Sequence, residues 1–160
     1  MSTNLTRALL LAATLFLAGG SNAESMIMGR VQMRAETAIE YVKSSIEEHG
    51  YTIAHIQLCD GGMTDFGYKS DLYRVVFFGK IDEVRSISER HPELVSYLPL
   101  KIAVIAEKGE TLLTVLDPDA LAPFYADRDL QIQLGRWHND LISIFDDVRR
   151  ATGHSIAAAK

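Results

Sequence analysis

The sequence has 160 residues, and its 16 lysine and arginine residues against 21 aspartate and glutamate residues give a formal net charge of −5. The acidic residues are spread along the chain and no basic stripe could follow a phosphate backbone, which argues against a nucleic-acid-binding protein. Cys59 is the single cysteine, so no disulfide can form within the chain, and a folded domain must be stabilised by burial.

The first 23 residues have the three regions of a cleavable secretory signal. Arg7 and the amino terminus are basic, residues 8–18 read ALLLAATLFLA, and residues 19–23 (GGSNA) end in a small-x-small pattern. An apolar helix of this length would span roughly 16 Å, about half of a bilayer core, so a signal is favoured over a retained membrane anchor. We expect cleavage between Ala23 and Glu24 and an exported product, periplasmic in a Gram-negative cell and otherwise secreted.

Removal of the signal leaves 137 residues, enough for one domain with a core and too few for two. We expect this domain over residues 24–150 and a flexible tail over residues 151–160. Residues 26–34 (MIMGRVQMR) are compatible with a strand. Apolar residues then recur at helical spacing from Ala38 to Ile46, which predicts an amphipathic helix ending at Gly50.

The remaining elements follow in a regular order. Residues 51–59 (YTIAHIQLC) and 72–78 (LYRVVFF) predict strands joined by a glycine-rich connection, and residues 81–89 predict a short helix. Residues 100–106 and 111–116 predict a hairpin that turns at residues 107–109. Beyond Asp127, apolar residues at steps of three and four predict one long helix. They are Leu130, Leu134, Trp137, Leu141, Phe145 and Val148.

The predicted order is β-α-β-β-α-β-β-α, without internal repeats. Runs of neighbouring strands of this kind favour an antiparallel sheet over the parallel sheet of alternating α/β folds. We therefore predict a single α+β domain with a largely antiparallel open sheet and its helices packed on one face.

Two stretches resemble the DUF302 family of small bacterial and archaeal α+β domains, for which no function is agreed. They are residues 35–56 (AETAIEYVKSSIEEHGYTIAHI) and residues 75–121, the latter including HPELVSYLP and the hairpin that ends in LDP. The resemblance implies an open sheet of the TATA-binding-protein-like type, commonly paired as a homodimer. Family members often carry a cysteine followed by Asn-Pro after the third strand; Phe78 and Gly79 occupy that place here, so no role for such a cysteine is carried over.

The sequence lacks the common motifs of catalytic and phosphate-binding sites. The sequence contains no phosphate loop, Gly-x-Ser-x-Gly, His-Glu-x-x-His or Cys-x-x-Cys pattern. We therefore favour a non-catalytic domain that binds a small apolar or redox-active ligand, or a protein partner, through a groove between sheet and helix or through a dimer edge. The alternative is a periplasmic redox or metal accessory protein, or an enzyme, that uses Cys59 or His138.

Five residues are candidates for contact with a ligand. Aromatic side chains between a sheet and a helix can line a ligand groove, although they are more often core residues. An aspartate before proline at a strand end more often caps the following turn than faces a ligand, and a histidine on a helix more often makes one structural hydrogen bond. The candidates are Tyr68, Phe78, Asp117, Trp137 and His138.

No metal or cofactor is predicted. Cys59 and Met63, with other methionines, are weak candidates for a soft metal such as Cu(I), and His138 for an axial haem ligand. Methionine in a strand is more often a packing residue, and free cysteine usually packs as a small hydrophobic side chain.

Overall fold

The computed structural model describes residues 25–59, 61, 65–67 and 72–158, with side chains as far as residue 151. The expected signal peptide, with its cleavage site at Ala23 and Glu24, therefore lies outside the described residues. The same holds for two of the candidate site residues, Met63 and Tyr68.

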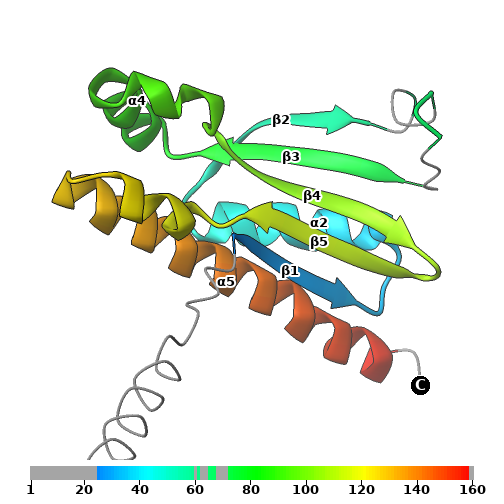
Figure 1. Cartoon of the computed structure of the whole chain (residues 1–160). Coiled ribbons are helices and arrows are strands. Elements are labelled where there is room, and N and C mark those ends of the chain that lie inside the picture. Colours follow the sequence, from blue (N-terminus) through cyan, green and yellow to red (C-terminus); the bar gives the residue numbers. More distant parts are fainter. Residues whose placement is uncertain (1–24, 60, 62–64, 68–71, 159–160) are drawn as a thin grey trace, which may run out of the picture.

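Five antiparallel strands form one open sheet (Figure 1). The first and last strands in the sequence pair with each other, so the sheet order is β1-β5-β4-β3-β2. The strands are β1 (Met26–Val31), β2 (Thr52–Leu58), β3 (Tyr73–Gly79), β4 (Leu100–Glu107) and β5 (Glu110–Leu116).

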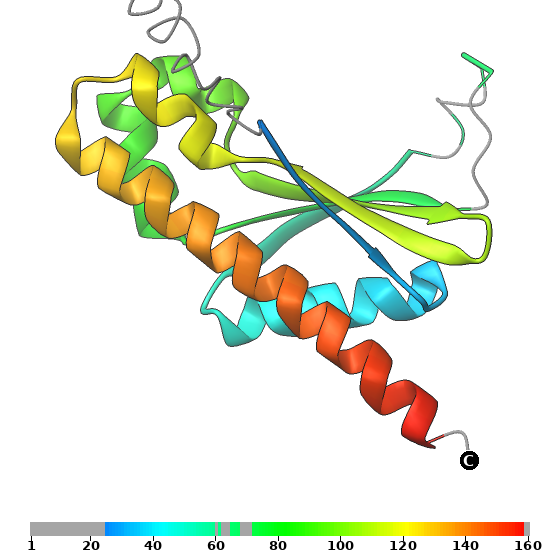
Figure 2. The same cartoon turned by 60° about the horizontal axis from the view of Figure 1, so that its bottom comes forward.

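The helices α2 (Ala35–Glu48) and α5 (Arg128–Ala158) lie side by side on one face of the sheet (Figure 2). The short helix α4 (Ile81–Arg90) and the 3₁₀ segment η1 (Pro92–Ser96) connect β3 to β4, and a second 3₁₀ segment, η2 (Pro118–Phe124), leads from β5 to α5. The predicted α+β fold, its antiparallel open sheet and the order of its elements are confirmed.

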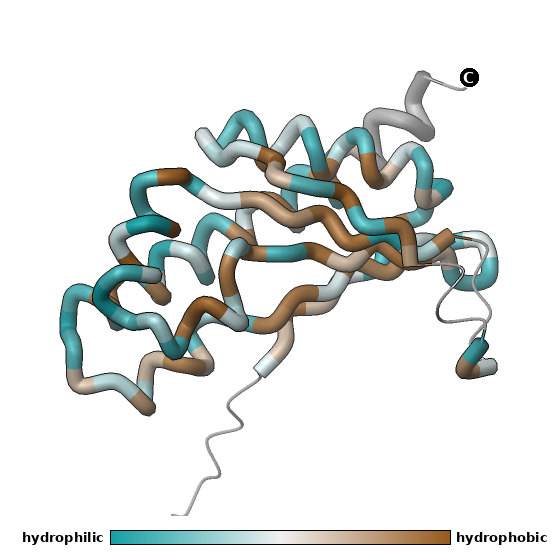
Figure 3. Tube along the Cα trace, turned by 90° about the horizontal axis from the view of Figure 1, so that it is seen from above, coloured by the Kyte–Doolittle hydropathy of each residue, from teal (hydrophilic) through white to brown (hydrophobic). Residues whose placement is uncertain are grey.

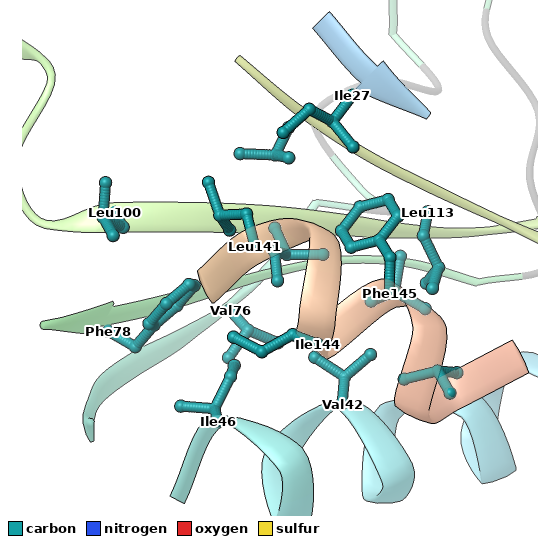
Figure 4. Packing of buried hydrophobic residues seen from close by; sticks show 14 of the residues in the cluster. Ile27, Val42, Ile46, Val76, Phe78, Leu100, Leu113, Leu141, Ile144 and Phe145 are labelled. Atoms are coloured by element: carbon teal, nitrogen blue, oxygen red, sulfur yellow. The ribbon is translucent and has the colours of Figure 1, made fainter. Parts of the chain in front are cut away.

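The core lies between the sheet and these two helices. Figure 4 shows Val42 and Ile46 of α2 facing Ile144 of α5, with Val76 of β3 beside them. Every apolar residue in the predicted stripe of α5 is buried. In Figure 3 the strands are largely hydrophobic, whereas the helices alternate between hydrophobic and hydrophilic residues, as helices with one covered face do.

Details of the elements differ from the sequence prediction in two places. β1 ends at Val31, because the chain turns there toward α2 and the hydroxyl of Thr111 donates to the carbonyl of Met33 at 2.7 Å. Helix α5 continues to Ala158, past Arg150, where a tail was expected. The hairpin between β4 and β5 turns at the predicted place, with positive φ angles at Lys108 and Gly109 that suit a two-residue turn.

Candidate functional site

Asp117 and His138 form a pair at the end of the sheet. Asp117 follows β5 and caps η2, where its Oδ1 accepts a hydrogen bond from the backbone amide of Asp119 at 2.9 Å. The Nδ1 of His138, on α5, lies 2.9 and 3.0 Å from the two carboxylate oxygens of Asp117. The carboxylate accepts hydrogen bonds only, so it favours the tautomer with the proton on Nδ1. The predicted cap is present, and the same carboxylate also orients the histidine ring.

Trp137, the neighbour of His138, is buried and fixed by a carboxylate. Its Nε1 donates to Oε2 of Glu83 on α4 at 2.9 Å. Gln133 and Arg136, also on α5, donate to the two oxygens of Glu83, each at 3.2 Å. A single acidic side chain thus ties α4 to α5 and holds the indole ring in one orientation.

A small cavity lies beside Trp137, where η1 and η2 meet α5 and the ends of β4 and β5. Its volume is about 40 Å³. Its walls are apolar, and Leu116 and Pro118, which flank Asp117 in the sequence, are among the lining residues. Lys101 is the charged residue among those that line the cavity. The Asp117–His138 pair therefore lies next to a hydrophobic hollow whose one ionic group is a cation.

Phe78 lies in the core, away from the other candidate ligand-binding residues. It is fully buried in the core and packs edge-on against Tyr51, with the ring centroids 5.4 Å apart. Asp117, Trp137 and His138 are thus brought together near the cavity, whereas Phe78 is a packing residue of the sheet. Tyr68 lies outside the described residues.

A second polar cluster was not expected from the sequence. The hydroxyl of Tyr51 donates to Oδ2 of Asp140 at 2.6 Å, and Nζ of Lys80 lies 3.7 Å from the same oxygen and 4.4 Å from the tyrosine ring centroid. Burial, and then Asp140, raise the pKa of Tyr51 far above its ordinary value, so the phenol stays protonated. The three residues come from separate segments and carry no common motif, so pattern reading has no signal for them.

Two further histidines lie close to aspartates of α5 or of its start and help to hold this helix in place. His49, at the C-terminal end of α2, lies 3.1 Å from Asp147, and His91, after α4, lies 2.9 Å from Asp127 at the start of α5. Because Asp127 also accepts backbone hydrogen bonds at the start of α5, its role is structural.

Cys59 follows β2 and is half-buried, with its Sγ 3.8 Å from the carbonyl oxygen of Gln57. Across the part of the chain that the structure describes, no three histidine, cysteine, aspartate or glutamate side chains come together in a way that could hold a metal ion. The expectation that no metal is bound stays a prediction.

The sheet face opposite α2 and α5, here called the bare face, is apolar across its centre. Neighbouring strands are in register along a row that runs from Met28 through Thr114, Ala103 and Val75 to Gln57. Alternate residues of these strands are buried under the helices, so the row points the other way. The apolar residues of the bare face are Met26, Met28, Tyr73, Val75, Phe77, Ala103, Ile105, Leu112 and Leu116.

Most charges on the bare face gather at the hairpin end, where they pair within the chain, whereas Lys101 lies beside Phe77 toward the other end. Arg30 on β1 lies 2.7 Å from Glu107 and 4.0 Å from Glu110. The amide of Gln32 donates to Glu110 at 2.7 Å. This end of the face is therefore largely neutralised by its own residues.

The family model for the domain of unknown function DUF302 matches residues 29–148. The chain belongs to the DUF302 family. The match begins within β1 and ends within α5, so it includes the other four strands, α2 and most of the length of α5. Among the described residues, no helix of this DUF302 protein is long and apolar enough to cross a membrane.

A solved structure has the same fold as this DUF302 domain. The crystal structure of an uncharacterised conserved DUF302 protein from Bacillus stearothermophilus superposes with a TM-score of 0.69 at 17% sequence identity. The superposition covers 79% of this chain and 100% of the other. A search of the curated proteins gives no match. The comparisons thus establish the family and its fold.

Proposed function

We propose that this protein is an exported, non-catalytic interaction module whose bare sheet face binds a second copy of the chain. The observation that carries the proposal is the apolar centre of that face. An antiparallel sheet covered by helices on one side commonly has a polar, solvated opposite face. Here Met28 is 61% exposed and Met26 44% exposed, Leu116 lies beside Met26, and most other residues across the centre of the same face are apolar. Contiguous exposed apolar patches mark interaction surfaces.

The charges of the bare face favour a second copy over a charged partner. The row from Met28 to Gln57 has no ionised side chain, and Arg30, Glu107 and Glu110 at the hairpin end satisfy one another within the chain. Lys101, beside Phe77, is a single cation toward the other end of the face, too little to recruit a highly charged partner. A second copy presents the same largely apolar surface, and two sheets can pack face to face about 10 Å apart around a two-fold axis.

A glutamate at the centre of the bare face tests this proposal. We expect the Ile105→Glu variant to be monomeric while the unsubstituted protein is dimeric, because each subunit would have to bury a carboxylate against an apolar surface. Native mass spectrometry reports the masses. The matched control is Ile132→Glu, which places the same charge at a 54% exposed position on α5 and should leave the dimer intact. A dimer that survives Ile105→Glu, with the fold retained by circular dichroism, would exclude the bare face.

Export is the second part of the proposal and is supported by the pattern of residues 1–23. Expression with these residues in a Gram-negative host should give a product in the periplasmic fraction whose intact mass corresponds to residues 24–160. A product that keeps residues 1–23 or stays in the cytoplasm, in cells that export and process a control protein normally, would contradict export.

One observation favours a second candidate, an enzyme that uses His138. A carboxylate that holds Nδ1 of a histidine is the arrangement by which general bases are oriented. Hydrolysis of a panel of activated esters should then fall on His138→Gln substitution and persist in His49→Gln. A redox or metal role, through Cys59 with copper or through His138 with haem, predicts metal content or visible absorbance in the purified protein.

A further inference from the structure

We infer that the cavity beside Trp137 binds a slim apolar carboxylate, of the medium-chain alkanoate class, with the end of its tail in the cavity and its carboxylate at Lys101. The inference rests on the walls of the cavity, the state of the lysine and the size of the hollow. It does not require self-association, although Leu116 belongs both to the bare face and to the wall of the cavity.

The walls of the cavity offer an alkyl chain only apolar contact. Side chains from η1, η2, both central strands and α5 contribute, among them Leu94, Leu100, Val115, Leu121 and Leu134. Leu94 and Leu134 are almost fully buried, so the floor of the cavity is part of the core. Each methylene moved from water into such a site lowers the free energy of binding.

Lys101 supplies the charge that would select an anion. Its Nζ lies 3.4 Å from the carbonyl oxygen of Ser96 and 6.0 Å from the ring centroid of Phe77. Within residues 25–59, 61, 65–67 and 72–151, no carboxylate forms an ion pair with this lysine. Other lysines with described partners, such as Lys43 and Lys80, do pair with carboxylates. A cation without an acidic partner at an apolar cavity is complementary to a ligand that joins an anionic head to an apolar tail.

The size of the cavity selects the shape of the tail. A cavity of roughly 150 Å³ is needed to hold a benzene ring. At about 40 Å³ the cavity beside Trp137 has room for the end of a chain and is too small for a ring or for a flat cofactor such as haem. An unbranched alkyl tail fits this limit.

Trp137 provides the signal for a direct test, because it is the single tryptophan of the chain and lines the cavity. Decanoate, kept below its micelle concentration, should change the tryptophan fluorescence in a saturable way. Shortening the chain should weaken binding by about fourfold for each methylene that is withdrawn from the cavity. Acetate should give no change, and decanol should bind more weakly than decanoate.

Two variants and a control separate the contribution of the ligand's carboxylate to binding from that of its alkyl tail. Lys101→Met keeps the length of the side chain and removes its charge, and should weaken decanoate about two- to fivefold while leaving decanol unchanged. Leu121→Phe should fill the cavity and abolish the fluorescence change. Lys108→Met, at the exposed hairpin turn, is the matched control and should bind as the unsubstituted protein does.

Equal affinity for decanoate and decanol would overturn the role of Lys101. Saturable binding that survives Leu121→Phe in a folded protein would overturn the cavity as the site. Repeating the titration with the Ile105→Glu variant distinguishes this inference from self-association, since the cavity residues are unchanged there and binding should persist whether or not the protein is dimeric.

Discussion

At the scale of single residues, Asp117 shows what a local pattern can predict. An aspartate before a proline at a strand end predicts a cap, and the cap is present. The bond to His138 could not be predicted, because it joins residues 21 positions apart on different elements. The identity of Glu83 as the partner of Trp137 is equally a result of how α4 and α5 pack.

Substitutions of Asp117 separate its two roles. Asp117→Ala removes both the cap of η2 and the partner of His138, and should lower the free energy of unfolding by about 1–3 kcal/mol. Asp117→Asn keeps an oxygen for the cap and should cost about 1 kcal/mol or less. Urea unfolding monitored by Trp137 fluorescence measures both. Equal losses in the two variants would show that the cap contributes little.

Two glycines have opposite expected responses to alanine. A Cβ on Gly79 would lie 2.7 Å from Cγ2 of Val84, so Gly79→Ala should destabilise the protein by about 1–3 kcal/mol. A Cβ on Gly135, inside α5, would meet Asp119 at an ordinary 3.8 Å. Gly135→Ala should therefore raise the free energy of unfolding by about 1 kcal/mol through helix propensity. Thermal melts of both variants check the signs, and a stabilised Gly79→Ala would contradict the close approach of Val84 to Gly79.

At the scale of elements, the helical stripe and the hairpin were predictable because their periods are fixed by the backbone. The bare face was not recognised, although β3 gave a signal: its segment LYRVVFF is apolar on both faces, whereas a strand with one solvated face should alternate. When a strand is apolar on both faces, the sequence does not say which of the two faces is covered by helices. Only the position of α2 and α5 on one face decides which residues remain uncovered.

The aspartates that attach α5 to the rest of the domain make the free energy of unfolding depend on pH in the acid range. The pKa of Asp147 is lowered first by its hydrogen bond from Ser45 and then by His49 and Arg150, and backbone amides and His91 lower the pKa of Asp127. A carboxyl whose folded pKa lies below its unfolded value of about 4 stabilises the fold above that pH. This stabilisation is lost as the pH falls through the lower folded value.

We therefore expect the melting temperature to fall between pH 5 and pH 2. Asp147→Asn should lower stability at pH 7 and flatten this fall, because the substituted side chain no longer titrates. Asp146→Asn is the matched control on α5, since its carboxylate pairs only with the exposed Arg149 at the next turn among the described residues. Melting curves with the same slope for both variants would contradict the role of Asp147.

At the scale of the whole molecule, the order of the elements along the chain predicted the fold class, and the structure and its match to a solved DUF302 structure confirm it. The order of the strands in the sheet was beyond pattern reading, because β1 pairs with β5 across most of the domain. That pairing extends the bare face by Met26 and Met28. The cavity depends on a different arrangement, in which η1, η2 and α5 meet the ends of β4 and β5.

The most direct test of the central claim is sedimentation equilibrium of residues 24–160 over a wide range of protein concentrations. Self-association through the bare face predicts a mass that approaches twice that of the chain as the concentration rises, and that changes little with salt because the buried surface is apolar. A mass of one chain at all concentrations would contradict the account and leave the bare face to a different partner.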